Sequence, residues 1–450
     1  MAKPVVTTRI LRRLLAVGVD GRASRLLSRI HPADLGPLLA ELTSDELRSV
    51  IDLLSRQGRA ASVLRELPPE LFPEIIAALP DERLATVLAG AEVDDLLELI
   101  DALPEERREP VRELLPEEQR AELNKVELYP PRSAGRAMTT SYLALDQKMS
   151  AQEAIDSIRA VGEALGSILY LYVVDEDGRL QGVVPIRRLV AAPPDTPCAD
   201  FMSRDPVRVS PDAPQEEAAQ LVARYDLLAI PVTAADGTML GVITVDDVID
   251  VIHEEATEDM YHLAGLSEED RVFTSPSLSI RKRVPWMFLN LGTVFAAAWV
   301  VGLFENTLEQ VVTLALFLPV VAGLAGNGGI QALTVTTRGI ALGEIEFSSG
   351  LRAVGKELAV GLAIGLMVGT LGGLVTFLWQ GNAFLGLVLF LSMLLTMTVA
   401  GLMGAAVPLA LKALRLDPAL GAGVIVTFFA DAFGIFCFLG IATLLLDRIA

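Results

Sequence analysis

The apolar residues that follow Arg281 form long runs, whereas those before it alternate with charges over short distances. A helix needs roughly 20 apolar residues to cross a bilayer. Five segments meet this requirement: about 284–304, 311–337, 358–379, 383–411 and 419–446. The earlier pattern is typical of water-soluble elements. The chain is therefore predicted to be multidomain, with a soluble front half and an α-helical membrane domain of five transmembrane helices.

The charges that flank the apolar segments predict their orientation. Lysine and arginine stand at 281–283 before the first span, at Arg338, Arg352 and Lys356 between the second and third, and at Lys412 and Arg415 between the fourth and fifth. The other two connections, "ENTLEQ" and "QGNA", contain neither residue. Because cytoplasmic loops carry the excess of basic residues, the N-terminus is expected in the cytoplasm and the C-terminus outside.

Two internal repeats organise the soluble half. Residues 42–128 predict short helices in a twelve-residue register, with proline near each start and acids in the first turn, where they suit the helix dipole. The copies begin at Leu67, Leu79, Ala91, Leu103 and Leu115. Residues from Ala137 to about Ile252 contain a duplicated strand–helix–strand–strand–helix unit, whose hairpins turn at Asp177-Gly178 and Asp236-Gly237. An all-α repeat domain followed by an α+β pair is expected.

Charge narrows the choice of partners. The chain has a net charge of −20, and before Arg281 it holds 28 basic and 49 acidic residues. So acidic a domain excludes nucleic acid as a partner and suits divalent cations. The two cysteines provide neither a disulfide framework nor a zinc site. The segment "MAKPVVTTRILRRLLAVGVDGR" has no signal-peptide core, which agrees with a cytoplasmic front half.

A single charged residue, Asp431, interrupts the last apolar run, "GAGVIVTFFADAFGIFCFLGIATLLL". A carboxylate there costs about 2.5–3.5 kcal/mol on insertion scales. Thr427 and Gly423 continue its helical face, and the interiors of the last three spans offer no lysine or arginine as a partner. We interpret Asp431 as facing water or a transported ion; the alternative is a protonated or hydrogen-bonded structural acid.

The second span carries polar residues on one helical face. Its sequence, "LPVVAGLAGNGGIQALTVTTRG", places Gly323, Asn327, Gln331, Thr334 and Arg338 on that face. Pro319 and the glycines near Asn327 weaken the backbone ladder there. The pattern favours a hydrated pore wall at Asn327 and Gln331, although amides also join membrane helices by hydrogen bonds. The four-residue glycine spacing of the third span predicts close helix packing.

An acidic helix joins the two halves. In "TVDDVIDVIHEEATEDMYHLAGL", one stripe comprises Asp246, Asp250, Glu254 and Glu258, and a second comprises Asp247, Glu255 and Asp259. Acids at this spacing destabilise a helix by about 0.2–0.5 kcal/mol per pair. A solvated face is the usual explanation. The alternative is that divalent cations lie between these stripes and the acids of the helical repeats, at Asp94 and Asp95, and so control a gate.

Two family resemblances rest on these motifs. The duplicated unit resembles a tandem pair of CBS domains, a family in which "GVITVDD" holds the ribose and phosphates of an adenine nucleotide; Thr244 and Asp247 match that pattern. The first copy reads "GVVPIRR", which leaves Arg187 or Arg188 to contact a phosphate. A purely structural pair is the alternative. The whole chain resembles the MgtE family of bacterial magnesium channels and transporters. The resemblance rests on the order of the domains and on two motifs, "PVVAGLAGNGGIQALTVTTRGIALGE" and "ADAFG".

The MgtE resemblance implies a homodimer in the bacterial plasma membrane that imports Mg²⁺, with Asp431 as the ion-selecting acid. It implies a plug helix from about Val248 to Leu266 and closure by cytosolic Mg²⁺; ATP or another adenine nucleotide is expected at the CBS pair. The predicted domains are 1–132 (helical repeats), 133–252 (CBS pair), 253–280 (plug) and 281–450 (membrane). The predicted regulatory metal ligands are the acids of the two stripes together with Asp94, Asp95, Glu216, Asp226 and Asp417.

Two other functions compete with a magnesium channel. One is a proton- or sodium-coupled secondary transporter of divalent metals, in which Asp431 exchanges a proton. The other is a membrane-bound nucleotide sensor that transports nothing. An enzyme is not expected, because the sequence has no phosphate-binding loop, nucleophile elbow or metal-binding histidine pair. His31, His253 and His262 are scattered.

Overall fold

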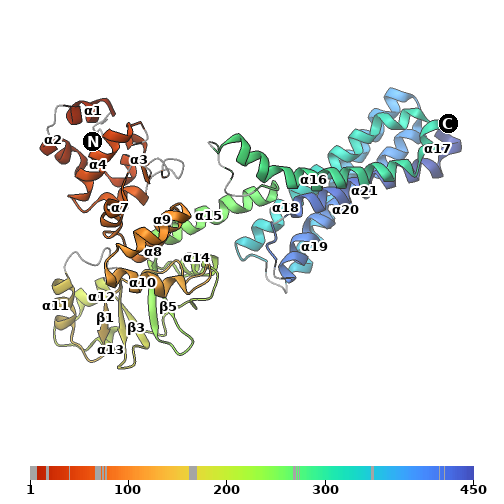
Figure 1. Ribbon diagram of the computed structural model, residues 1–450. Coiled ribbons are helices and arrows are strands. Elements are labelled where there is room, and N and C mark those ends of the chain that lie inside the picture. The colour runs from red at the N-terminus through yellow and green to blue at the C-terminus, as the bar shows by residue number, and fades with distance from the viewer. Residues whose placement is uncertain are drawn as a thin grey trace. The chain divides into compact units, whose positions relative to one another are not determined.

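The computed structural model describes residues 8–449, except 17–19, 40, 66–71, 73–74, 77–78, 162–169, 267–269, 271, 273, 346–348, 415 and 420. The chain divides into two compact units, Met1–Ile252 and His253–Ala450. Each unit is described by itself below. Figure 1 labels the elements of both units.

The first unit opens with helices that pack their apolar faces into one core. They are α1 (Thr8–Ala16), α2 (Asp20–Leu27), α3 (Pro32–Leu39), α4 (Ser44–Ser55), α5 (Ala60–Arg65), α7 (Asp81–Leu88), α8 (Val93–Asp101), α9 (Glu105–Glu113) and α10 (Glu117–Glu127). The last four begin at intervals of twelve residues, which confirms the predicted register. Proline provides the N-cap of α7, α9 and α10, where its fixed φ suits entry into a helix. The copy at Leu67 lies outside the described residues.

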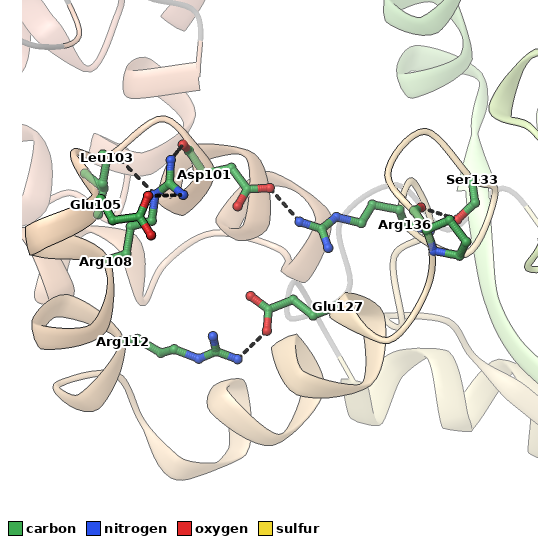
Figure 2. A network of polar contacts seen from close by, with 9 residues as sticks. Asp101, Leu103, Glu105, Arg108, Arg112, Glu127, Ser133 and Arg136 are labelled. Atoms are coloured by element: carbon green, nitrogen blue, oxygen red, sulfur yellow. Dashed lines mark hydrogen bonds and ion pairs between the residues drawn. The ribbon is translucent and has the colours of Figure 1, made fainter.

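Arginines join the repeats to one another and to the segment that follows (Figure 2). Arg108 donates to the carbonyl of Leu103 at 3.0 Å and to that of Asp101 at 2.7 Å. The Asp101 carboxylate in turn accepts from Arg136 at 2.6 Å. The bond from Arg108 to the Asp101 carbonyl satisfies one of the last carbonyls of α8, which have no partner within the helix. Because Arg136 precedes the first strand, the network also fixes where the α+β region begins.

The α+β region follows the predicted order in its first copy. This copy comprises β1 (Ala144–Asp146), α11 (Ala151–Val161), β2 (Tyr170–Val174), β3 (Leu180–Pro185) and α12 (Ile186–Ala191). Next come α13 (Cys198–Phe201), β4 (Ser203–Arg204), α14 (Gln215–Tyr225), β5 (Ala229–Thr233) and β6 (Met239–Thr244). Strands β1 and β2 pair in parallel, whereas β2–β3 and β5–β6 are antiparallel. The hairpin glycines Gly178 and Gly237 adopt φ of 76° and 89°, as turns of this kind require.

The two copies exchange the segments that precede them. Strand β4 pairs with β3 of the first copy, and the four strands lie in the order β1-β2-β3-β4. Reciprocally, Thr139 bridges to Val242 in the second copy. A Cβ atom on Gly182 would come within 2.8 Å of the Ser203 carbonyl, and one on Gly241 within 2.6 Å of the Thr139 carbonyl. The glycines therefore admit the exchanged backbone. The opening strand β1 of the first copy has as its counterpart in the second only an isolated parallel bridge between Val209 and Val232.

The second unit contains the predicted apolar helices. Helix α15 (Val245–Leu263) leads into it, followed by α16 (Pro276–Gly302), α17 (Glu305–Gln310), the 3-10 helix η1 (Val312–Phe317), α18 (Leu318–Ala341), α19 (Gly350–Gln380), α20 (Ala383–Ala413), α21 (Ala422–Leu444) and α22 (Leu446–Ile449). Five of these segments, with η1 and α18 counted together, are long and apolar enough to cross a membrane. This confirms the expected fold class.

Helices α19 and α20 pack along the predicted glycine face. Gly361, Gly365, Gly369 and Gly373 are all buried. A Cβ atom on Gly361 would lie 2.5 Å from the Met397 carbonyl, and one on Gly373 would lie 2.7 Å from the Gly386 carbonyl. Only glycine permits backbones to approach this closely, so the expectation of close packing is confirmed. Helix α20 of this pair also packs against α18 and α21, the helices that carry the polar residues.

Candidate functional site

Asp431 lies on α21, against a glycine of α18. A Cβ atom on Gly326 would lie 3.6 Å from Asp431 Oδ1 and 3.7 Å from Thr427 Cγ2. Thr427 donates its hydroxyl to the carbonyls of Gly423 and Val424, at 2.9 and 3.1 Å. Asp431 Oδ1 is buried and has no hydrogen-bond partner among the residues that the structure describes. A buried acceptor of this kind is costly unless a ligand or water completes it.

The polar residues of α18 share one uncovered face. Gly323, Asn327, Gln331, Thr334 and Arg338 are all exposed in the single chain, while Val321, Ala325, Ala332 and Leu333 are buried. Asn327 directly follows Gly326, the residue that touches Asp431. Asp431, Thr427 and Asn327 therefore come from two helices in contact at one level of the bundle. Gln331 lies one helical turn further along α18.

The end of α15 contacts the start of α21 within the second unit. A Cβ atom on Gly423 would lie 2.8 Å from the Leu263 carbonyl. Gly265 has φ of 69°, and a Cβ atom there would lie 3.8 Å from the Trp286 ring. Gly423 thus allows the last turn of α15 to pack against α21, the helix that carries Asp431. Gly265 allows the chain to turn beside Trp286 of α16. This placement suits the predicted role of α15 as a plug.

One group of predicted regulatory acids surrounds an arginine. Arg65, the last residue of α5, forms ion pairs with Asp95 at 3.0 Å, Asp247 at 3.2 Å and Asp250 at 2.8 Å. Although burial disfavours the charged form of Arg65, these carboxylates raise its pKa above the ordinary value. One guanidinium therefore holds the helical repeats on the first turns of α15. We name this group, with Asp94, the Arg65 cluster.

Asp94 is the most buried acid of the Arg65 cluster. Burial raises its pKa to about 8, helped by the neighbouring charges of Asp247, Asp95 and Glu92. Burial likewise raises the pKa of Asp95 to about 6, despite the opposing effect of Arg65. Asp94 Oδ1 has no hydrogen-bond partner among the described residues. The cluster thus holds more potential negative charge than Arg65 neutralises.

The second group lies at the other end of α15. His262 Nδ1 is 2.7 Å from Asp417 Oδ2, and its Nε2 is 3.7 Å from Glu258 Oε1. Burial raises the pKa of Asp259 to about 6, with contributions from Asp417, Glu255 and Glu258. These five residues form the His262 cluster, which gathers four of the predicted regulatory acids.

The remaining predicted regulatory acids are not members of the Arg65 or His262 cluster. Asp246 and Glu254 are exposed on α15, Glu216 is exposed in the first turn of α14, and Asp226 follows that helix in the left-handed conformation. The stripe of Asp247, Glu255 and Asp259 is the partly buried one. Among the described residues, no three histidine, cysteine or acidic side chains are arranged to hold a metal ion. In both clusters a basic side chain stands between the acids.

The predicted nucleotide residues are already engaged within the protein. Thr244 donates its hydroxyl to Asp247 Oδ2, and Asp247 Oδ1 accepts from Arg65. Arg188 donates to the Phe201 carbonyl at 3.1 Å and to the Ser203 hydroxyl at 3.0 Å. Arg187 is exposed. Of the two arginines, Arg187 is thus the one better placed to meet a phosphate.

Three charged residues near these sites are not among the predicted site residues. Arg65 is separated from Asp247 by 182 positions, and no local pattern links them. His262 has an i, i+4 relation to Glu258, which is a readable signal in the sequence. Glu357 is only 5% exposed, although it lies just before the predicted third apolar segment.

Comparison with known proteins covers nearly the whole chain. The profile of the MgtE intracellular N domain matches residues 30–132, that of the CBS domain matches 134–195 and 198–254, and that of the MgtE divalent cation transporter matches 318–441. The magnesium transporter MgtE of Thermus thermophilus is 36% identical over 437 residues, 96% of each chain. The chain belongs to the MgtE family. The Bacillus subtilis magnesium transporter MgtE is 31% identical over 90% of this chain and 99% of its own.

Solved structures in the MgtE family match the soluble half. The cytosolic domain of the Mg²⁺ channel MgtE in complex with ATP is 36% identical, with a TM-score of 0.51 over 54% of this chain and 99% of that one. The soluble part of a magnesium transporter is 27% identical, with a TM-score of 0.53 over 55% of this chain and 98% of that one. Membership of the family confirms the resemblance and agrees with a multi-pass membrane protein that is not an enzyme.

Replacing Arg65 by Met should loosen the helical repeats from the CBS pair. Three carboxylates would lose a charge-assisted partner, which costs about 1–3 kcal/mol. Hydrogen exchange of the full chain in Mg²⁺-free buffer should show faster exchange in α8. The matched control is Arg83→Met, because Arg83 pairs with Asp52 on the surface of the repeats. Equal behaviour of the two variants would contradict the assigned role of Arg65.

Without divalent cations, the first unit should lose stability as pH rises. The folded chain binds the Asp94 proton up to about pH 8, whereas the ordinary pKa is 3.8. The contribution of Asp94 to stability is therefore full below its ordinary pKa and is lost as pH rises toward 8, because ionisation places its charge beside Asp95 and Asp247. Thermal unfolding of the full chain between pH 5 and 9 measures this effect. Asp94→Asn should flatten the profile; an unchanged slope would refute the assignment.

Proposed function

We propose that this MgtE-family chain is a magnesium-selective channel of the bacterial plasma membrane, closed by Mg²⁺ that binds its acidic cytosolic regions. The observation that carries the proposal is Asp431: a carboxylate on an apolar helix, with one buried oxygen lacking a partner among the described residues. Its neighbours Thr427, Asn327 and Gln331 supply neutral oxygens. The Thermus and Bacillus relatives are named magnesium transporters, which makes Mg²⁺ the expected cargo.

The chemistry of Mg²⁺ suits such a site. Magnesium dehydrates reluctantly and keeps several of its waters. A site with one carboxylate and several neutral oxygens binds the hydrated ion through these waters. At an effective dielectric of 20, a divalent ion ~5 Å from a carboxylate gains about 6–7 kcal/mol before desolvation, and a monovalent ion half as much. Charge therefore favours divalent over monovalent ions.

A second copy of the chain completes the pathway in this proposal. The polar face of α18 is exposed along its whole length in a single chain, although it belongs to an apolar helix of the membrane region. Polar groups that face lipid are costly, whereas groups that line a hydrated cavity are not. A homodimer that places two such faces around one axis supplies the cavity and doubles the Asp431 charge.

The proposed orientation follows from the flanking charges. Arg281, Lys282 and Arg283 lie in α16 near its start, Arg352 and Lys356 lie near the start of α19, and Lys412 ends α20. These ends are placed at the cytoplasmic surface, with the C-terminus outside. Arg415, in the same connection as Lys412, is outside the described residues. The soluble first unit then meets cytosolic Mg²⁺.

Regulation is assigned to the Arg65 and His262 clusters. In both, burial and like charges raise the pKa of a carboxyl group, so a divalent cation would bind by displacing a proton or a basic side chain. Binding at the His262 cluster would act on the end of α15, which contacts Gly423 on α21. The other predicted ligands, Glu216, Asp226, Asp246 and Glu254, are exposed acids outside the two clusters, and they stay predicted ligands of the regulatory ions.

An adenine nucleotide is assigned to the CBS pair. The cytosolic domain of a relative is described in complex with ATP. Here Thr244 and Asp247 offer the hydroxyl and carboxylate for a ribose, and exposed Arg187 offers a charge for a phosphate. Arg65 also forms an ion pair with Asp247. A nucleotide that binds Asp247 would therefore use the same carboxylate that docks the helical repeats through Arg65.

Proton- or sodium-coupled transport is the second candidate, and it is less favoured because the cytosolic domain of a relative is described as part of a Mg²⁺ channel. A sensor without transport is excluded if the membrane domain conducts. Single-channel current with no proton or sodium gradient separates a channel from a coupled transporter, and Mg²⁺ flux of any kind rules out the pure sensor.

Asp431→Asn should reduce Mg²⁺ flux into proteoliposomes at least tenfold, because loss of the charge removes the divalent preference. The control is Asp447→Asn, which neutralises an acid in α22 outside the polar site. Flux is measured with a magnesium indicator trapped inside the vesicles. Unchanged flux in Asp431→Asn would refute the pore assignment.

Neutralising the His262 cluster should weaken closure by internal Mg²⁺. We expect Asp259→Asn combined with Asp417→Asn to raise the Mg²⁺ concentration that halves the current by about tenfold. Glu217→Gln serves as the control, because it removes one exposed acid that lies outside both clusters. If the double variant closes at the wild-type concentration, the cluster does not sense the ion.

A further inference from the structure

A cavity of about 190 Å³ lies between α18, α19 and α20 within the second unit. Gln331 and Val335 line it from α18, Lys356, Glu357 and Ile364 from α19, and Met397 from α20. Gln331 also belongs to the exposed polar face of α18. The cavity is therefore next to the proposed ion pathway, on the half of α18 that follows Asn327.

Glu357 gives this cavity its charge. The residue is only 5% exposed, and it lies two turns into a helix that is apolar for most of its length. Its Oε1 atom accepts from Lys356 Nζ at 2.5 Å. An acid inside a membrane helix is a functional candidate by default. The Lys356 side chain is 59% exposed, so its ammonium reaches both water and the carboxylate.

The backbone around Glu357 is fixed by contact. A Cβ atom on Gly401 would lie 2.6 Å from the Glu357 carbonyl, and one on Gly361 would lie 2.5 Å from the Met397 carbonyl. Both glycines line the cavity. Their lack of side chains brings α19 and α20 together and leaves the space open above them. Glu357 thus lies on a part of α19 whose backbone packs closely against α20.

The cavity has room for several water molecules, and magnesium prefers six oxygen ligands in octahedral geometry, most of them waters. One carboxylate and one amide suit contact with such waters, whereas a dehydrated ion would need more direct ligands.

We propose that Glu357 and Gln331 form a second binding site for the hydrated divalent cargo, and that Lys356 is the resident counter-ion which the cargo displaces. Under the proposed orientation this site lies on the cytoplasmic side of Asp431, where an entering ion leaves the pathway. The inference rests on the proposed magnesium flux. It adds a residue, Glu357, whose charge sets how tightly the ion is held before release.

The test compares three variants in proteoliposomes by the Mg²⁺ concentration at half-maximal flux. Glu357→Gln should raise this concentration at least fivefold, because the site loses its charge. Lys356→Gln should lower it two- to fivefold, because the ion no longer competes with the ammonium. Glu344→Gln, an exposed acid before α19, should leave it unchanged.

A merely structural ion pair predicts a different result. Either single substitution would then break the pair, and both would shift the half-maximal concentration in the same direction or leave it at the wild-type value. Either outcome overturns the second site. Glu357→Asp keeps the charge and should stay within twofold of wild type, so it serves if Glu357→Gln fails to fold. Absence of flux in the wild-type protein would instead refute the proposed function.

Discussion

A carboxylate that is withdrawn from water requires a nearby positive charge or a proton, and the arrangement of this molecule depends on how that requirement is met. Arg65 supplies the charge for Asp95, Asp247 and Asp250. His262 stands between Asp417 and Glu258, and Lys356 stands beside Glu357. In each case the protein places a basic side chain where a cation would otherwise be needed. Asp431 differs, because one of its oxygens is buried and has no partner among the described residues.

This contrast separates the two proposed regulatory centres and the proposed Glu357 site from Asp431. Where a basic side chain is resident, an incoming ion must displace it, so occupancy responds to the free concentration of that ion. Where none is resident, the ion meets no competitor and need not be held tightly to enter. An ion-selecting acid in a conducting pathway suits the second arrangement. A sensor that releases its ligand when supplies fall, or a site that holds the ion before its release, suits the first. The same residue type, aspartate, thus suits both tasks because its surroundings differ.

Local patterns in the sequence predicted the parts that local forces determine. The twelve-residue register and the acids of each first turn predicted the helices that start at Asp81, Val93, Glu105 and Glu117, because capping and first-turn charges act within a few residues. Helical periodicity likewise placed Asn327 and Gln331 on one exposed face. Contacts across long separations could not be read in this way. Arg65 reaches its acids only after the repeats fold onto the α+β region, and Glu357 becomes a buried acid only because Gly361 and Gly401 draw two helices together.

The exchanged segments of the duplicated region make each copy depend on the other for a complete sheet. In each copy, the edge of the sheet pairs with the backbone segment that precedes the other copy, and Gly182 and Gly241 leave room for these segments. A chain severed between the copies would expose an open edge on both halves, and open edges invite pairing with foreign strands. The two copies are therefore expected to unfold together, because loss of one removes the backbone that pairs with the sheet edge of the other.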